Sequence, residues 1–245
     1  MKLAQLAFPA LALAANGHAE RSGEAIGPLP DLPKCQAEYI PLVDGPIPGD
    51  PLAIEAKFAS IAVTDPTIMA VATLAGGTVC VDITWASQIE NMEFLRSERF
   101  LGFDWYGYEA FGYMLIDRAG AGRVIDSGVR PIFSPGGKHL ASLQVSEAGW
   151  GGMEGFAVWE VTPNDLDRIA EAGLDDEGVL PEIFRQEVAD WRIDRWIGES
   201  CLAISAATRA DLSEHENDDP RIPRQPYYAR EDEGWEIRPG HCYKP

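Results

Sequence analysis

The chain has 245 residues, with 39 acidic and 20 basic side chains and a formal net charge of −19. A surface of that charge repels phosphate backbones and anionic headgroups, so neither nucleic acid nor an anionic lipid surface is an expected partner. The charge maintains solubility, and it leaves cationic proteins and divalent cations electrostatically acceptable.

The first residues have the order of a secretory signal. Lys2 precedes an apolar run from Leu3 to Ala15, and Gly17-His18-Ala19 places small residues at the cleavage positions. The run is shorter than the ~20 apolar residues that span a bilayer. We predict a signal peptide over 1–19, cleavage near Ala19, and a periplasmic or secreted mature protein without membrane insertion. The alternative, a buried N-terminal helix, is disfavoured because Pro9 interrupts the run.

Four cysteines, Cys35, Cys80, Cys201 and Cys242, lie in the remaining chain. An even number in an exported protein favours two disulfides. We expect the sequence neighbours to pair, Cys35 with Cys80 and Cys201 with Cys242; the rival pairing joins Cys35 to Cys242. The spacing matches no zinc motif, and we expect no metal and no cofactor.

Residues 20–55 are rich in proline and predict an extended arm. Residues 56–245 alternate short apolar runs with turn residues, which predicts a single β domain; the runs at 68–74 and 78–85 flank Gly76-Gly77 as a hairpin. Further expected strands are Arg99–Phe103, Phe111–Asp117, Arg123–Asp126, Arg130–Ser134, His139–Val145, Phe156–Val161, Trp191–Trp196, Cys201–Ala206, Tyr227–Arg230 and Trp235–Arg238.

Two segments near 162–190 have features of helices and predict a helical insertion. Thr162-Pro163-Asn164-Asp165 offers a hydroxyl N-cap, a proline and an acid for a helix that ends at Gly173. The second expected helix covers about Pro181 to Ala189, with an apolar face.

The clearest internal pattern is a repeat at an offset of 45 residues. Trp-Tyr-Gly-Tyr-Glu-Ala-Phe starts at Trp105, and Trp-Gly-Gly-Met-Glu-Gly-Phe starts at Trp150, so that four of seven positions are identical. Each copy predicts a turn that joins two strands, and a period near 45 is typical of a four-stranded propeller blade.

The segment from Tyr113 to Leu143 resembles the WD40-like repeats of TolB-type β-propellers. Phe133-Ser134-Pro135-Gly136-Gly137 matches the family's turn, with Gly136 where aspartate is usual, and Cys201 to Arg238 carries a weaker echo. The resemblance implies an all-β fold with minor helical insertions, an irregular propeller of about four to five blades. A β-sandwich is the alternative, but it does not explain the offset.

Equivalent turns of neighbouring blades lie on one face of a propeller. That face would carry aromatic and acidic side chains suited to a sugar ring or an apolar side chain of a protein. The candidate ligand-binding residues are Trp105, Tyr106, Tyr108, Glu109, Trp150 and Glu154. The competing interpretation, which we favour, is that the repeated tryptophans pack between blades.

No residue pattern indicates catalysis. Glu109 and Glu154 are a conceivable carboxylate pair for glycoside hydrolysis, but catalytic residues rarely recur with a structural repeat. We therefore expect an exported, non-catalytic binding protein whose partner is a protein or a cell-envelope glycan. The alternatives are a hydrolase that uses these carboxylates and an acidic inhibitor of a cationic enzyme.

Overall fold

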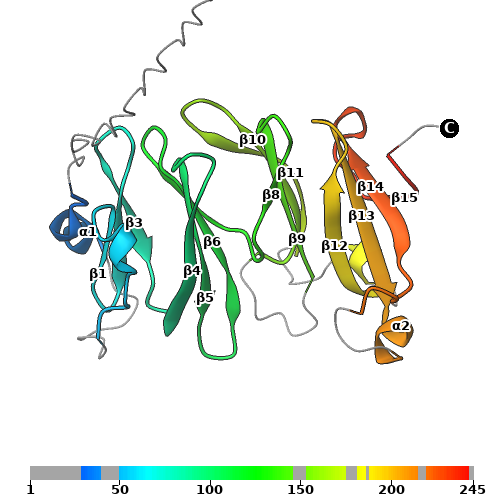
Figure 1. Ribbon diagram of the computed structural model, residues 1–245, viewed down its shortest axis with the longest axis horizontal. Helices are drawn as coiled ribbons and strands as arrows, with labels where there is room; N and C mark the ends of the chain where they lie inside the picture. Colours follow the sequence, from blue (N-terminus) through cyan, green and yellow to red (C-terminus); the bar gives the residue numbers. More distant parts are fainter. Residues whose placement is uncertain are drawn as a thin grey trace, which may run out of the picture.

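The computed structural model describes residues 29–39, 50–145, 153–174, 181–185, 188–214 and 219–242, and of residues 188 and 189 only the backbone. These residues form four antiparallel sheets that follow one another in chain order along the long axis of the molecule (Figure 1). In every sheet the strands are neighbours in the same order as in the sequence. Each sheet is therefore a meander, the topology of a propeller blade.

The first sheet has three strands and the second has four. The strands of the first sheet are β1 (Ala62–Thr64), β2 (Ile68–Ala72) and β3 (Thr78–Asp82). Those of the second are β4 (Gln88–Leu95), β5 (Phe100–Tyr106), β6 (Phe111–Asp117) and β7 (Arg123–Asp126).

The third and fourth sheets have four strands each. The third contains β8 (Ile132–Phe133), β9 (His139–Gln144), β10 (Gly155–Val161) and β11 (Leu166–Gly173). The fourth contains β12 (Val188–Trp196), β13 (Cys201–Thr208), β14 (Gln225–Arg230) and β15 (Arg238–Pro239). The helices are α1 (Leu32–Glu38) and α2 (Arg209–Ser213), with 3₁₀ turns at Ala56–Phe58, Glu182–Phe184 and Glu231–Glu233.

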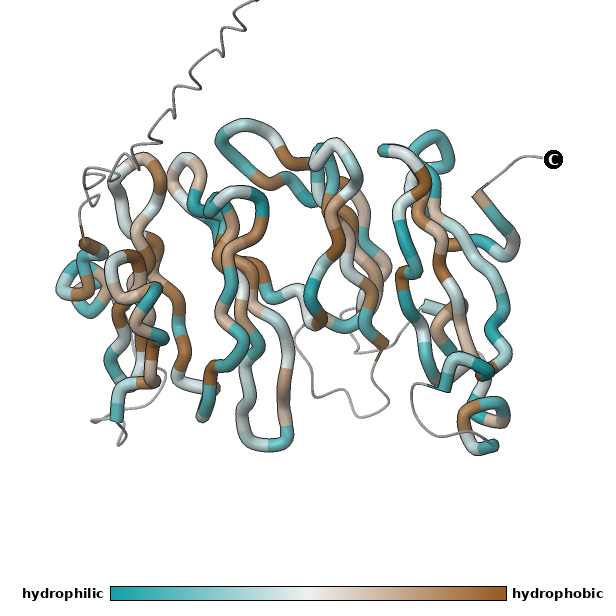
Figure 2. Tube along the Cα trace, viewed as in Figure 1, coloured by the Kyte–Doolittle hydropathy of each residue, from teal (hydrophilic) through white to brown (hydrophobic). Residues whose placement is uncertain are grey.

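Successive apolar side chains along a strand point to alternate faces of the sheet, and they fill the space on both faces of the inner sheets. In β5, Phe103 and Trp105 pack toward the first sheet, whereas Phe100 packs toward the third. Another apolar cluster joins the third sheet to the fourth around Phe156 and Trp191. Figure 2 shows the resulting hydrophobic stretches within the four sheets, with hydrophilic residues in many of the connecting loops. Because an inner sheet is buried on both faces, its strands contain long apolar runs.

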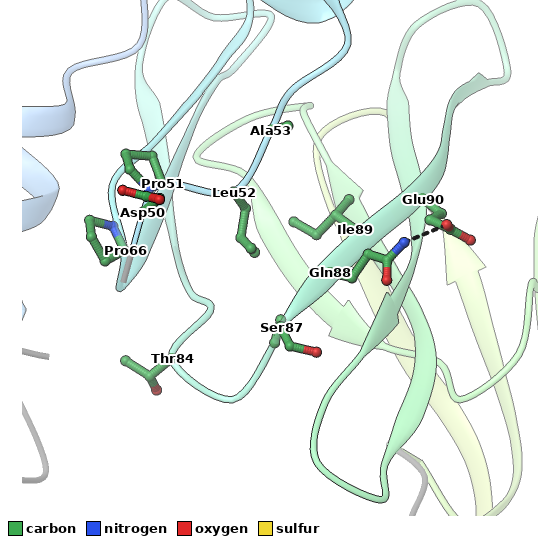
Figure 3. Close-up of a pocket in the computed structure, with 11 residues that line it drawn as sticks. Asp50, Pro51, Leu52, Ala53, Pro66, Thr84, Ser87, Gln88, Ile89 and Glu90 are labelled. Atoms are coloured by element: carbon green, nitrogen blue, oxygen red, sulfur yellow. Dashed lines mark hydrogen bonds between the residues drawn. The ribbon is translucent and has the colours of Figure 1, made fainter. Parts of the chain in front are cut away.

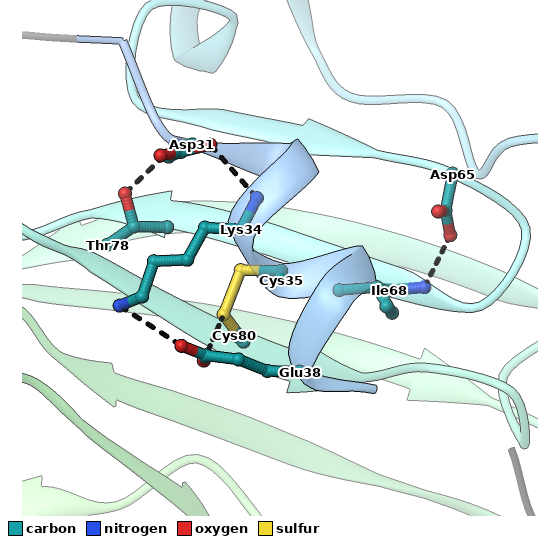
Figure 4. The surroundings of a disulfide bond; sticks show 8 residues. All are labelled: Asp31, Lys34, Cys35, Glu38, Asp65, Ile68, Thr78 and Cys80. Atoms are coloured by element: carbon teal, nitrogen blue, oxygen red, sulfur yellow. Dashed lines mark hydrogen bonds and ion pairs between the residues drawn. A yellow bond between two sulfur atoms is a disulfide. The ribbon is translucent and has the colours of Figure 1, made fainter. Parts of the chain in front are cut away.

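Helix α1 covers the outer face of the first sheet. Asp31 caps its first turn by accepting a hydrogen bond from the Lys34 backbone N–H, and Cys35 is disulfide-bonded to Cys80 of β3 (Figure 4). Ile68 and Ala70 pack beneath the helix. The second disulfide joins Cys201 to Cys242, and no described cysteine is free. Both preferred pairings are confirmed, and two disulfides fit an oxidising compartment.

Arginines link neighbouring sheets at the ends of the strands where the β4–β5 and β10–β11 turns lie. Arg118 donates to the carbonyl of Ala72 in the first sheet. Arg99 pairs with Asp117 at 2.7 Å and also donates to the carbonyls of Thr162 and Asp165 in the third sheet. These bonds fix the relative positions of three sheets without adding apolar area.

The predicted turn at Ser134–Gly137 is confirmed. It joins β8 to β9 within the third sheet and is hydrogen-bonded to Glu199 of the fourth. The Gly137 N–H donates to the Ser134 carbonyl. The Glu199 carboxylate accepts from the Ser134 hydroxyl at 2.6 Å and from the Gly136 N–H. A Cβ on Gly136 would lie 2.8 Å from that carboxylate. The glycine in place of the usual aspartate thus admits a carboxylate from the neighbouring sheet.

The helical insertion expected near 162–190 is wrong. Thr162 and Asp165 bond to each other across a tight turn, and Leu166–Gly173 is strand β11, paired with β10. The spacing of Leu166, Ile169 and Ala170 resembles a helical face, but pairing with β10 outweighs that weak preference. In the described part of the second segment, 181–185 and 188–189, the helical residues are Glu182–Phe184, a 3₁₀ turn, and β12 begins at Val188.

The extended arm predicted for 20–55 also needs a correction, because it contains α1. Pro33 lies in the first turn of that helix, where its missing N–H costs no hydrogen bond. The predicted signal peptide at 1–19 lies outside the described residues. Among the residues that are described, no helix is long and apolar enough to cross a membrane.

Candidate functional site

The 45-residue repeat corresponds to the third strands of two sheets but not to their second strands. Phe111 and Phe156 lie at the starts of β6 and β10. Tyr106 pairs with Phe111 and Leu143 pairs with Phe156, so four residues separate the first pair and twelve the second. Ser142 therefore matches Trp105 in register, which contradicts the expected equivalence of Trp105 and Trp150. Trp150 itself lies outside the described residues.

Trp105 is buried and packs between the first two sheets. Its side chain is only 5% exposed, its ring centroid lies 4.4 Å from that of Trp85, and a Cβ on Gly112 would lie 2.8 Å from its indole. The glycine is thus required by the indole that covers it. Trp105 cannot serve as an exposed binding platform, and for this residue the packing interpretation is correct.

The candidates Tyr106 and Tyr108 are exposed on the hairpin that joins β5 to β6. Tyr106 and Phe111 pair at its base, with 39% and 54% exposure, and Tyr108 is 86% exposed at its tip. Glu109 has a left-handed backbone, with φ of 56°. Trp85, from the β3–β4 connection, is 38% exposed beside the hairpin. We call these four aromatic residues, Trp85, Tyr106, Tyr108 and Phe111, the aromatic tip.

The two candidate carboxylates have different environments. Glu109 is exposed within the turn of the hairpin, whereas Glu154 is buried just before β10. Their positions give no support to a matched acid and base on one surface. Among the described residues no group of three or more His, Cys, Asp or Glu side chains could hold a metal ion.

A cleft of about 660 Å³ lies between the first two sheets, next to the aromatic tip. Figure 3 shows Asp50 and Pro51 on one wall, Gln88 and Glu90 on the other, and Leu52 with Ile89 between them. Sequence reasoning missed this cleft, because its walls come from segments more than thirty residues apart. Of the aromatic tip, Tyr106 and Tyr108 were named from the sequence because they lie in one local motif, whereas Phe111 and Trp85 were missed.

Two carboxylates with displaced pKa values, Glu93 and Asp126, do not line the cleft. The Arg130 guanidinium and the Tyr113 hydroxyl donate to Glu93 and hold the pKa of its carboxyl below the usual value. Burial raises the pKa of Asp126. Glu93 accepts from Arg130 and Tyr113, and Asp126 accepts from the Gly128 N–H, so these shifts indicate structural roles.

No protein-family model matches the chain, and no curated protein matches it. One solved structure is similar, that of a candidate 6-phosphogluconolactonase from Bacteroides fragilis, with 12% identity and a TM-score of 0.31. The match covers 70% of this chain and 49% of that one, so this chain spans about half of its length. The fold class defined by the strands is an all-β row of blade-like meanders. The similarity is too low to carry an argument about activity.

Proposed function

We propose that this chain is an exported, non-catalytic binding protein that recognises a partner protein through the aromatic tip. The observation that carries the proposal is the exposure of Tyr106, Tyr108 and Phe111 on one hairpin. Exposed apolar patches on soluble proteins mark interaction sites, and tyrosine is enriched at such sites because it is apolar, rigid and able to hydrogen-bond.

A protein fits this surface better than a glycan does. The hairpin between β5 and β6 projects from the end of the second sheet (Figure 1), and Tyr108 in its turn is 86% exposed, so this side chain lies on a protruding loop and not in a pocket. Small ligands are usually bound in concave sites that bury most of their surface. The predicted signal peptide and the two disulfides support export to the periplasm or beyond.

Affinity capture from a cell-envelope extract tests the proposal. The mature wild-type chain is compared with Tyr108→Ser/Phe111→Ser and with a matched variant, Leu74→Ser/Ile169→Ser, which removes exposed apolar side chains elsewhere. We expect one protein to be retained saturably by wild type and by the matched variant, and lost with the tip variant. Equal retention by all three, or release of sugar from envelope glycan by the wild-type chain, would contradict the proposal.

A further inference from the structure

We propose that the cleft between the first two sheets binds a lysine or arginine side chain on an extended basic segment of the partner protein. The inference rests on the proposed binding function and names the chemistry of the partner. It begins from the cleft, which is large enough for a long side chain and lies beside Trp85 of the aromatic tip.

The inner part of the cleft is apolar. Leu52 and Ile89 are partly buried and pack on the core between the first two sheets. Figure 3 shows both side chains between the two walls. Lysine and arginine carry three or four methylene groups that bury well against such surface while the charged group stays at a polar rim.

The rim of the cleft is acidic and rich in hydrogen-bond acceptors. Asp50 and Glu90 are exposed on opposite walls, and no described lining residue is a lysine or arginine. Gln88 donates to Glu90 at 2.6 Å, which orients that carboxylate. Hydrogen bonds from a cation to a carboxylate are stronger than neutral ones. The rim thus complements a positive group, as does the net charge of −19.

The backbone beside the cleft suits an extended ligand. Strand β4 is at the edge of its sheet, and the register with β5 shifts between Glu90 and Glu93, where Asn91 has a φ of 51°. The part of β4 that lines the cleft, 88–90, thus pairs regularly with β5 up to this irregularity. An extended segment can lie along such an edge through main-chain hydrogen bonds. Trp85 lies between the lining residues Thr84 and Ala86 and is 38% exposed, so its ring is open to a second cation.

Amide chemical-shift mapping tests the inference. The isotope-labelled mature chain is titrated with a capped Ala-Lys-Ala-Lys-Ala peptide, and with the same peptide carrying norleucine for lysine, at about 0.15 M salt to screen surface attraction. We expect saturable shifts at Leu52 and at 87–90 with the lysine peptide alone. Asp50→Asn/Glu90→Gln is expected to weaken binding about tenfold. A control with the same charge change, Asp167→Asn/Glu171→Gln on β11, should bind like wild type.

Three outcomes would overturn the inference: equal binding of the norleucine peptide, shifts spread over the acidic surface, or equal weakening by both charge variants. The amide spectrum of each variant shows separately that it is folded. If the tip variant loses the captured partner while Asp50→Asn/Glu90→Gln retains it fully, the cleft inference fails and the proposed function stands. If no partner is captured but the peptide binds in the cleft, the proposed function fails instead.

Discussion

The side chain of Asp117 is almost fully buried, with 1% exposure, and Arg99 is its ionic partner. Removing one member of such a pair leaves a buried polar group or charge without its partner. We predict that Asp117→Asn lowers the free energy of unfolding by about 2–4 kcal/mol, measured by urea denaturation. Asp232→Asn removes an exposed carboxylate from Arg230 and should change it by less than about 1 kcal/mol. Equal effects of the two substitutions would show that the buried Arg99–Asp117 pair stabilises the fold no more than an exposed pair does.

Glu93 makes the stability of the folded protein depend on pH in the acidic range. Because its pKa is lowered in the folded protein, its contribution to stability is present above the ordinary value of 4.5 and is lost as pH falls through the lower folded value. We predict that Glu93→Gln destabilises the protein at pH 7. The difference in stability between this variant and the wild type should become smaller below about pH 4.5. Urea midpoints between pH 7 and pH 3 measure this. A gap that stays constant with pH would contradict the assignment.

At the scale of single residues, the sequence predicted exposure poorly. Trp105 and Tyr106 are adjacent, yet one is buried and the other exposed, because alternate residues of a strand point to opposite faces. The face that each would occupy depends on which sheets lie on either side. The disulfide partners were predictable because both pairs are neighbours in sequence.

Helix α1 is joined to the first sheet by a covalent link. A helix of seven residues is too short to be stable alone, so its position relies on Cys35–Cys80 and on Ile68 beneath it. We predict that Cys35→Ser/Cys80→Ser removes hydrogen-exchange protection over 32–38 and lowers stability by about 2–4 kcal/mol. Protection in β13 should persist, since sheets stacked in a row contact mainly their neighbours. Unchanged protection at 32–38 would contradict this role of the disulfide.

Strands were predicted well where the alternation of residues was local. Strands β6 and β7 have the predicted bounds, and the hairpin around Gly76-Gly77 joins β2 to β3. The failure at 162–173 has a physical cause. Leu166 and Ile169 are spaced as on a helix, and only the partner strand β10 makes the segment a strand.

The arrangement of the whole molecule follows from burial on both faces of each inner sheet. The first and fourth sheets lie at opposite ends of the row in Figure 1, and three apolar clusters join successive sheets. The repeat predicted blade-like units. It did not predict that the first and last units lie at opposite ends of a row, because an offset between two neighbouring units carries no information on whether the units close into a ring. The cleft was unpredictable for the same reason: segments 50–53 and 84–90 meet only after the first two sheets stack.

Amide hydrogen exchange of the mature chain, with and without the captured partner, tests the central claim most directly. If the partner binds the aromatic tip, its addition should slow amide exchange at 84–88 and 106–111. Exchange at the opposite end of the same strands, in the β2–β3 turn at 73–77 and the β6–β7 turn at 118–122, should stay unchanged. Slower exchange confined to that opposite end, with none at 106–111, would contradict the account.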